Sequence, residues 1–263
     1  MKRIYFALLA TLFLVSCEKE ISIDLNSKDP KIVIEGIITD QTMPYSVKIS
    51  QTVNFIDSND FPPVINALVI IKDNVGVVDT LKQQVPGTYI TNRIVGKSGV
   101  KYDLYVKVNG NEYFATSTMP QKIKLDDLIF NLSSNPTGKE SYVTIPIFTD
   151  PAKLGDCYRF LQSTPDKKDK SIIVANDNIN NGLVNRRPIF SLDFDLIKGD
   201  IVTIEMRCID VNTYNYFYTL SQISGNGPGG GTTPSNPPNN ITGNDALGYF
   251  TAYTTTKITK EIN

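Results

Sequence analysis

Apolar residues recur at every second position through most of the chain, and this alternation constrains the fold more than any other feature. In the stretch 201–209, Val202, Ile204 and Met206 share one face, and polar side chains lie between them. A period of two is that of a β-strand with one buried face. Glycine, proline, asparagine and aspartate interrupt the alternation at short intervals, as they do in β-sandwich proteins. The sequence therefore predicts an all-β protein.

Two consecutive antiparallel β-sandwiches, of the immunoglobulin-like or transthyretin-like type, fit the order of these strands. Met119-Pro120 interrupts the alternation, because proline cannot donate a hydrogen bond within a sheet. We therefore expect an N-terminal sandwich over 31–120 and a C-terminal sandwich over 121–263. In the first, Asn109-Gly110 favours a tight hairpin, since both positions tolerate a positive φ. In the second, the glycine- and proline-rich stretch 225–240 cannot bury a core and is expected to be a flexible loop.

One short helix is expected in the second sandwich, over 213–223, because aromatic and apolar residues recur there near helical spacing. Asn212 or Thr213 would cap it. The tyrosines of this helix are Tyr214, Tyr216 and Tyr218. Two interpretations of the tyrosines stay open: a helix that packs its aromatic face on the sandwich, or a platform on which a sugar ring stacks.

The N-terminus has the pattern of a secretory leader. Lys2 and Arg3 precede an apolar run over 4–15, which is too short to span a bilayer but suits a signal peptide. The run ends in Leu14-Val15-Ser16-Cys17, which resembles the lipobox of bacterial lipoproteins. The resemblance implies that the chain is cut before Cys17 and that acyl chains such as palmitate are attached there. Two or more acyl chains anchor a protein stably where one does not.

This cleavage divides the N-terminal region into a signal peptide, 1–16, and a lipidated tether, 17–30. No later apolar run is long enough to cross a membrane, so we expect a lipid anchor in the outer membrane. Glu18-Lys19-Glu20 resembles the export signal of some surface lipoproteins. It favours display on the outer face and leaves the periplasmic face open.

Three further stretches carry a second resemblance. They are Lys31-Ile32-Val33-Ile34-Glu35-Gly36, Cys208-Ile209-Asp210 and Ala246-Leu247-Gly248-Tyr249-Phe250. Together they resemble an uncharacterised domain-of-unknown-function family of outer-membrane lipoproteins. Members are typically encoded beside TonB-dependent receptors, which implies an accessory role in uptake, and no catalytic residues are known for the family. The stretch 67–120 is also similar to the transthyretin-like, carboxypeptidase-regulatory-like sandwich, which supports the fold and not a function.

Histidine and tryptophan are absent from all 263 residues. Without histidine there is no Ser-His-Asp or Cys-His catalytic set and no imidazole metal site. The formal net charge is -1, from 26 basic and 27 acidic side chains, so nothing favours nucleic acid as a partner.

Three residue patterns resemble catalytic or metal-binding motifs, but each lacks a feature that the motif needs. Ser98 and Lys101 have the spacing of serine acyl-enzymes, but Gly99 favours a turn over the helical turn that this chemistry needs. Asp126-Asp127 would point to opposite faces of a strand, so it does not supply the paired carboxylates of a glycosidase. The polar stretch 176–182 lacks the closing acid of a calcium loop and is interpreted as a hairpin loop. We therefore expect no catalytic residue, no cofactor and no metal.

An oxidising envelope permits a disulfide between Cys157 and Cys208. Alternation places Cys208 on the apolar face of its strand, whereas Tyr158 and Phe160 place Cys157 on the other face of its own. This difference argues against the pair, and the disulfide stays an open alternative.

We interpret the chain as a non-enzymatic accessory or binding lipoprotein of the outer membrane, associated with a TonB-dependent uptake system, whose ligand the sequence does not name. A surface carbohydrate-binding or adhesion module without a transporter is the first alternative, with Tyr214, Tyr216 and Tyr218 as ligand contacts. A carboxylate-based hydrolase is the second.

Overall fold

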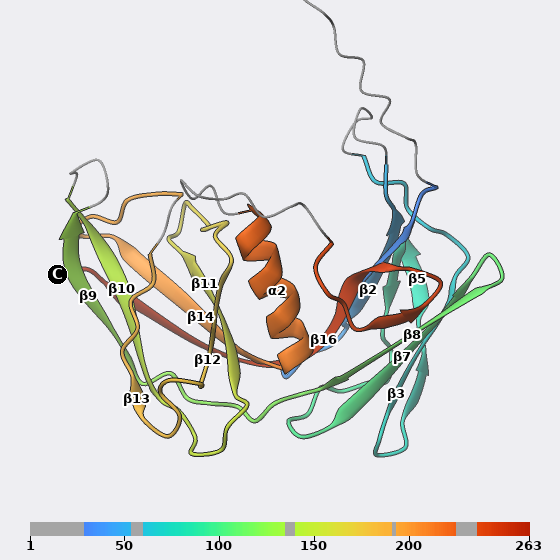
Figure 1. The fold of residues 1–263 in the computed structure, drawn as a ribbon, viewed down its shortest axis with the longest axis horizontal. Helices are drawn as coiled ribbons and strands as arrows, with labels where there is room; N and C mark the ends of the chain where they lie inside the picture. Colours follow the sequence, from blue (N-terminus) through green and yellow to red (C-terminus); the bar gives the residue numbers. More distant parts are fainter. Residues whose placement is uncertain (1–28, 54–59, 135–139, 191–192, 225–235) are drawn as a thin grey trace, which may run out of the picture.

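The computed structural model describes residues 29–53, 60–134, 140–190, 193–224 and 236–263. These residues form two β-sandwiches and one helix, so the expectation of an all-β fold is confirmed (Figure 1). The expected signal peptide, the lipidation site Cys17 and most of the expected flexible loop lie outside the described residues. Within them, no helix has both the length and the apolar character needed to cross a membrane.

One sheet of eight strands runs through both sandwiches. In order across the sheet, its strands are β12 (Ile173–Asn176), β11 (Cys157–Ser163), β14 (Ile201–Ile209), β16 (Leu247–Glu261), β1 (Ile32–Thr39), β2 (Ser46–Gln51), β6 (Thr88–Ile90) and β5 (Lys82–Val85).

The long strand β16 joins the two halves of this sheet, and Figure 1 shows it passing from one sandwich to the other. Its first half, 247–253, pairs in parallel with β1, and its second half, 254–261, pairs antiparallel with β14. Among the described strands, this parallel pair is the one exception to the expected antiparallel arrangement. Gly248 permits it, because a Cβ there would lie 2.0 Å from the carbonyl oxygen of Ile34 and its φ is +101°.

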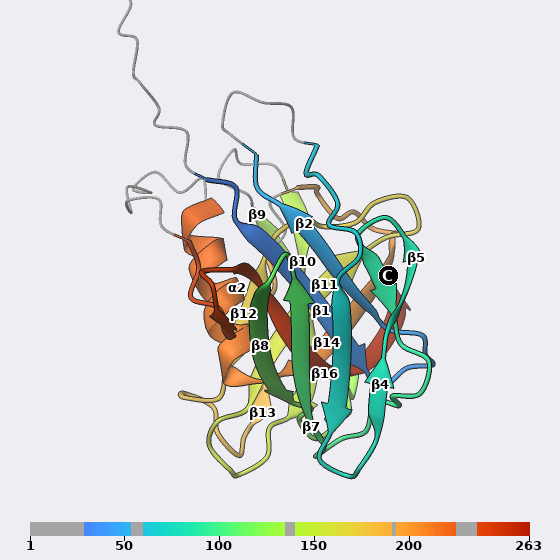
Figure 2. The same ribbon diagram turned by 90° about the vertical axis from the view of Figure 1, so that its right-hand side faces the viewer.

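A five-stranded sheet completes the first sandwich and faces the viewer in Figure 2. Its strands are β15 (Ile241–Gly243), β8 (Asn111–Thr118), β7 (Lys101–Val108), β3 (Leu68–Asp73) and β4 (Val78–Thr80). The predicted hairpin is confirmed, since Asn109 and Gly110 link β7 to β8 with φ values of 52° and 79°. Between the two sheets, Ile34, Val69 and Tyr102 are completely buried.

A three-stranded sheet covers the other half of the long sheet and completes the second sandwich. Its strands are β13 (Val184–Asn185), β10 (Glu140–Thr149) and β9 (Asp127–Ser134). The core between the sheets contains Val202, Ile204 and Met206, all with no exposed surface, so the predicted buried face of β14 is confirmed. Phe148 and Tyr158 pack beside them, with ring centroids 4.9 Å apart.

The C-terminal segment contributes to the first core as well as the second. Ile241, Ala246, Phe250 and Ala252 all belong to the hydrophobic core of the first sandwich. They reach it because β15 pairs with β8 and the first half of β16 pairs with β1. The structure therefore differs from the expected division at residue 120, since alternation along a strand does not reveal which sheet the strand joins.

The expected helix is present as α2 (Val211–Ser224). Its cap is Asp210, not Asn212 or Thr213 as we expected. The Asp210 Oδ1 atom accepts a hydrogen bond from the Thr213 amide at 2.8 Å, and the Asp210 carbonyl accepts one from the Tyr214 amide at 2.9 Å. An aspartate at this position is a strong cap because its carboxylate accepts one of the amide groups that the first turn leaves unpaired.

Candidate ligand-binding groove

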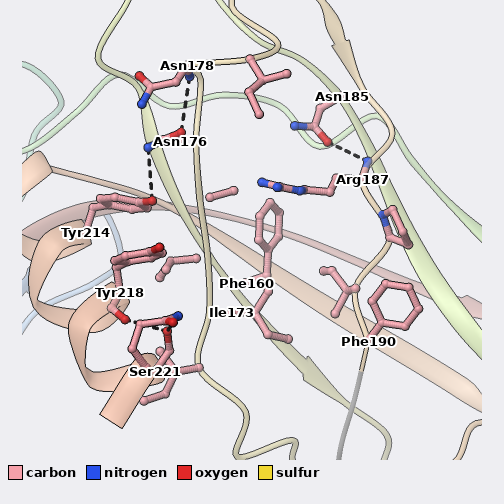
Figure 3. Close-up of a pocket in the computed structure, with 17 residues that line it drawn as sticks. Phe160, Ile173, Asn176, Asn178, Asn185, Arg187, Phe190, Tyr214, Tyr218 and Ser221 are labelled. Atoms are coloured by element: carbon pink, nitrogen blue, oxygen red, sulfur yellow. Dashed lines mark hydrogen bonds between the residues drawn. The ribbon is translucent and has the colours of Figure 1, made fainter. Parts of the chain in front are cut away.

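A groove of about 510 Å³ lies between α2, β12 and the segment 185–190 that follows β13 (Figure 3). This volume is within the range of sites that hold small organic molecules. The groove runs along β12, the edge strand of the eight-stranded sheet. Each of its three walls contributes a different kind of side chain.

Phe217 anchors α2 on the eight-stranded sheet and so sets which side chains face the groove. It is 5% exposed, and its ring centroid lies 5.1 Å from that of Tyr249 on β16. The guanidinium carbon of Arg159, on β11, lies 3.7 Å from the centre of the Phe217 ring. Such a cation–π contact is stronger where water is excluded. Burial, together with the nearby Arg207, lowers the pKa of Arg159.

The helix wall of the groove consists of two stacked tyrosines. Tyr214 and Tyr218 are one helical turn apart, so they lie on the same face of α2. Their ring centroids are 5.7 Å apart and their planes differ by 19°. Tyr218 is 48% exposed, which leaves much of its surface open to a ligand.

The second wall is the end of β12 and the residues after it, where asparagine side chains supply amide groups. Asn176 donates a hydrogen bond from Nδ2 to the Tyr214 hydroxyl at 3.2 Å. The Asn176 Oδ1 atom accepts a bond from the Asn178 amide at 3.4 Å. Phe160 from β11 forms the floor between the walls and is 5% exposed.

The third wall is the segment 185–190, and its main feature is Arg187. The Arg187 amide donates to Asn185 Oδ1 at 2.9 Å, which fixes the local backbone. The guanidinium extends toward the middle of the groove, between Asn185 and Phe160 in Figure 3. Phe190, 58% exposed, lies further along the same wall.

This arrangement can bind a polar organic molecule. Guanidinium groups donate paired hydrogen bonds to carboxylate or phosphate, amides both donate and accept, and tyrosine rings offer flat apolar faces. Burial raises the pKa of Tyr214, and the positive charge of Arg187 opposes that rise. The Tyr214 hydroxyl is therefore protonated near neutral pH and is available as a donor.

The three tyrosines that we singled out from the sequence do not act together. Tyr214 and Tyr218 lie in the groove, whereas Tyr216 faces away from it. The Tyr216 ring packs 4.9 Å from that of Tyr249 and 5.2 Å from that of Phe217. Residues two apart on a helix point in different directions, so the packing interpretation applies to Tyr216, and the ligand-contact interpretation stays a prediction for Tyr214 and Tyr218.

The two cysteines of the second sandwich are free and buried. Cys157 lies opposite Ile209, and Cys208 lies opposite Tyr158. The cysteines are therefore one position out of register, and their side chains point to opposite faces of the sheet. The open disulfide alternative is not realised, for the reason that the alternation indicated.

The structure does not bring together the other spacings considered for catalysis. The Ser98 hydroxyl donates to Gln121 Oε1 at 2.8 Å, and Lys101 pairs with Asp103 at 3.3 Å. Gly99, between them in the chain, has a φ of +79° and so forms the expected turn. Asp126 and Asp127 likewise pair with different lysines, Lys124 at 3.4 Å and Lys260 at 2.8 Å.

Most of the groove was not predicted from the sequence. Asn176 and Asn178 belong to the polar stretch 176–182, which we interpreted as a hairpin loop, and Arg187 was not among the predicted ligand contacts. The segment 185–190 has no periodicity that would predict its direction. The available signal was a run of asparagines followed by Arg186 and Arg187.

A family profile described as Domain of unknown function (DUF4249) matches residues 18–259, which include both sandwiches and all three walls of the groove. The chain belongs to this family. No curated protein shows significant similarity to this DUF4249 chain. Among solved structures, the selenomethionine-substituted chicken interferon gamma receptor alpha chain is similar over 69% of this chain and 90% of that one. Its sequence identity is 8% and its TM-score 0.20, values that say nothing about function.

Proposed function

We propose that this DUF4249 protein is a lipid-anchored, non-enzymatic binding protein of the outer membrane, and that its groove holds a polar ligand for a TonB-dependent uptake system. The observation that carries the proposal is the convergence of three elements on one groove. Tyrosine rings come from α2, amide groups from the end of β12, and the Arg187 guanidinium from the segment after β13.

The groups in the groove suit binding better than catalysis. Burial raises the pKa of Tyr214, so its hydroxyl does not exchange a proton near pH 7. The Ser221 hydroxyl donates to the Tyr218 carbonyl at 2.7 Å, and no basic side chain activates it among the described residues that line the groove. Groups that keep a single protonation state can bind and orient a molecule, but they cannot shuttle its protons.

The chemistry of the walls indicates the class of ligand. An arginine in a partly closed groove favours a carboxylate or phosphate, and the amides beside it favour hydroxyl groups. The stacked tyrosines favour a flat or ring-shaped body. We therefore expect a small ring-containing molecule with hydroxyl groups and an acidic group.

The lipid anchor rests on the lipobox that ends at Cys17. Growth with radiolabelled palmitate tests it: the native protein should carry label and fractionate with the outer membrane, and Cys17→Ala should do neither. Cys157→Ala is the matched control and should keep both properties. Native protein that carries no label would refute the anchor and leave the groove untouched.

The uptake partner is tested by affinity purification from detergent-solubilised outer membranes. A TonB-dependent receptor should co-purify with the native protein in stoichiometric amounts. If the purified protein comes alone under conditions that preserve other outer-membrane complexes, the association with uptake is wrong.

A surface carbohydrate-binding module without a transporter is the second candidate, and the stacked pair of Tyr214 and Tyr218 favours it. On a glycan array this candidate predicts binding that Tyr218→Ala abolishes. Tyr216→Ala should retain the binding, because Tyr216 packs on Tyr249 outside the groove. Glycan binding without a co-purifying receptor would favour this candidate over the first.

A further inference from the structure

Three aspartates from three different strand ends meet at one end of the second sandwich. Asp150 follows β10, Asp156 precedes β11 and Asp177 follows β12. One carboxylate oxygen from each lies within 4.8 Å of the other two. Asp150 and Asp156 stand at the two ends of the link between β10 and β11, and Asp177 joins them because β12 pairs with β11.

Two of these carboxylates are buried, and the third is partly buried. Asp150 and Asp177 are each 2% exposed, and Asp156 is partly buried. No lysine or arginine forms an ion pair with any of the three in the part of the chain that the structure describes. Like charges removed from water without a partner destabilise a protein.

Hydrogen bonds hold the carboxylates of Asp150 and Asp177 in position but leave one buried oxygen of Asp177 without a partner. The amides of Gly155 and Asp156 donate to Asp177 Oδ2 at 2.7 and 3.0 Å. The Gly182 amide donates to Asp150 Oδ2 at 3.1 Å, and the Tyr158 hydroxyl donates to Asp150 Oδ1.

The other oxygen of Asp177, Oδ1, is buried and has no hydrogen-bond partner at all. The amide oxygen of Asn181, in the loop after Asp177, is also buried and unpartnered, and its Nδ2 donates to the carbonyl of Ala152 at 3.1 Å. A buried charged oxygen without a partner is rare in folded proteins, because it loses its hydration and gains nothing. A cation between the carboxylates would give the Asp177 oxygen a partner and reduce the negative charge of the cluster.

We infer that Asp150, Asp156 and Asp177 form a binding site for a divalent cation, and that the cation is Ca²⁺. The donors are carboxylates, a set that suits hard cations. Loops supply them with no regular geometry, which Ca²⁺ accepts with its about six to eight ligands and Mg²⁺ does not. The buried Cys157 thiol, next to Asp156 in the chain, is no ligand for this cation, because Ca²⁺ takes oxygen ligands.

The site also adjoins the groove. Asp177 stands in the chain between Asn176 and Asn178, which form the second wall. A cation that holds Asp177 would therefore hold that wall, and cation and ligand would strengthen each other's binding. This coupling rests on the proposed function, whereas binding of the cation itself does not.

Thermal unfolding of the purified protein tests the site, with excess EGTA in one arm and CaCl₂ in the other. At a concentration about one hundred times its Kd, Ca²⁺ should raise the Tm of the native protein by about 5–10 °C. Asp156→Asn should lose most of this rise, and it should weaken Ca²⁺ binding in calorimetry at least about tenfold. In EGTA its Tm should equal or exceed that of the native protein, because one of three repelling charges is gone.

Asp126→Asn is the matched control, since Asp126 is an exposed aspartate of the same sandwich paired with Lys124. It should respond to Ca²⁺ as the native protein does. If Ca²⁺ leaves the native Tm unchanged, or raises the Tm of Asp156→Asn as much as that of the control, the site does not exist. A groove that binds no ligand would leave these results as they are, so the two proposals fail separately.

Discussion

Ser117 on β8 donates its hydroxyl hydrogen to Asp210 Oδ2, while the other carboxylate oxygen of Asp210 caps α2. The same hydroxyl accepts a hydrogen bond from the Ala252 amide on β16 at 2.8 Å. Ser117 is 2% exposed. A single buried serine therefore links the first sandwich, the strand shared by both sandwiches and the helix that forms one wall of the groove.

Replacement of Ser117 by alanine should destabilise the protein by about 2 kcal/mol, because it removes a partner from the buried Ala252 amide and from the partly buried Asp210 carboxylate. The free energy of unfolding, from urea titration, measures the change. Ser221→Ala removes a serine hydroxyl whose bond to the Tyr218 carbonyl is exposed, and should stay within about 0.5 kcal/mol of the native value. Equal free energies of unfolding for the two variants would show that the hydrogen bonds of Ser117 do not stabilise the protein.

Replacement of Gly248 should destabilise the protein more than replacement of Gly110. A Cβ there would lie 2.0 Å from the Ile34 carbonyl oxygen, and the φ of +101° adds strain for any other residue. Gly248→Ala should cost about 3 kcal/mol or more and should disturb both sandwiches, because β16 belongs to both.

Gly110→Ala isolates the steric part of this effect. Gly110 also has a positive φ, +79°, but nothing lies within 4 Å of its Cβ position. This variant should cost only about 1 kcal/mol. Urea unfolding, monitored by circular dichroism, measures the free energy of unfolding of both variants. A similar loss for both would contradict the close approach of β16 to β1.

The two free thiols should be unreactive while the protein is folded. Burial raises the pKa of Cys208, and it raises the pKa of Cys157 from about 9 to about 12. At pH 8 the folded protein should react with a thiol reagent many times more slowly than the unfolded protein, since the thiolate is the reactive form. Labelling of the native protein at the rate of an exposed thiol would refute this.

The same shift makes stability depend on pH in the alkaline range. The folded-state pKa of Cys157 lies above that of the unfolded chain, so its contribution is complete below about pH 9 and is lost as the pH rises toward 12. The Tyr249 hydroxyl, whose pKa burial raises to about 12, acts in the same direction. Stability that stays constant between pH 9 and 12 would contradict both assignments.

Much of the fold was open to prediction because its signals are local. Spacing and turn chemistry over fewer than about fifteen residues predict three features. These are the buried face of β14, the hairpin at Asn109-Gly110 and the helix α2. The opposite directions of Cys157 and Cys208 follow in the same way, because alternation along a strand sets its two faces.

What escaped prediction depends on contacts between distant segments. The alternation of β16 marks it as a strand, but nothing in it says that the strand changes partner from β1 to β14. The cap at Asp210 was missed because the helix begins two residues earlier than its apolar spacing indicates. Arg187 and the aspartates Asp150, Asp156 and Asp177 stand at strand ends, where no periodicity predicts which side chains meet.

Whether the groove holds a ligand is tested most directly by mass spectrometry of the small molecules that the protein retains when it is purified from its own membranes. We predict one compound at near-stoichiometric amount with the native protein, and at least about tenfold less with Tyr218→Ala and with Arg187→Ala. Phe114→Ala and Arg93→Ala are the matched controls. Phe114 is as exposed as Tyr218, and Phe114 and Arg93 both lie on the first sandwich, away from the groove. They should retain the compound in full. Equal retention by all five proteins, or no compound with the native one, would contradict a ligand-binding groove beside α2.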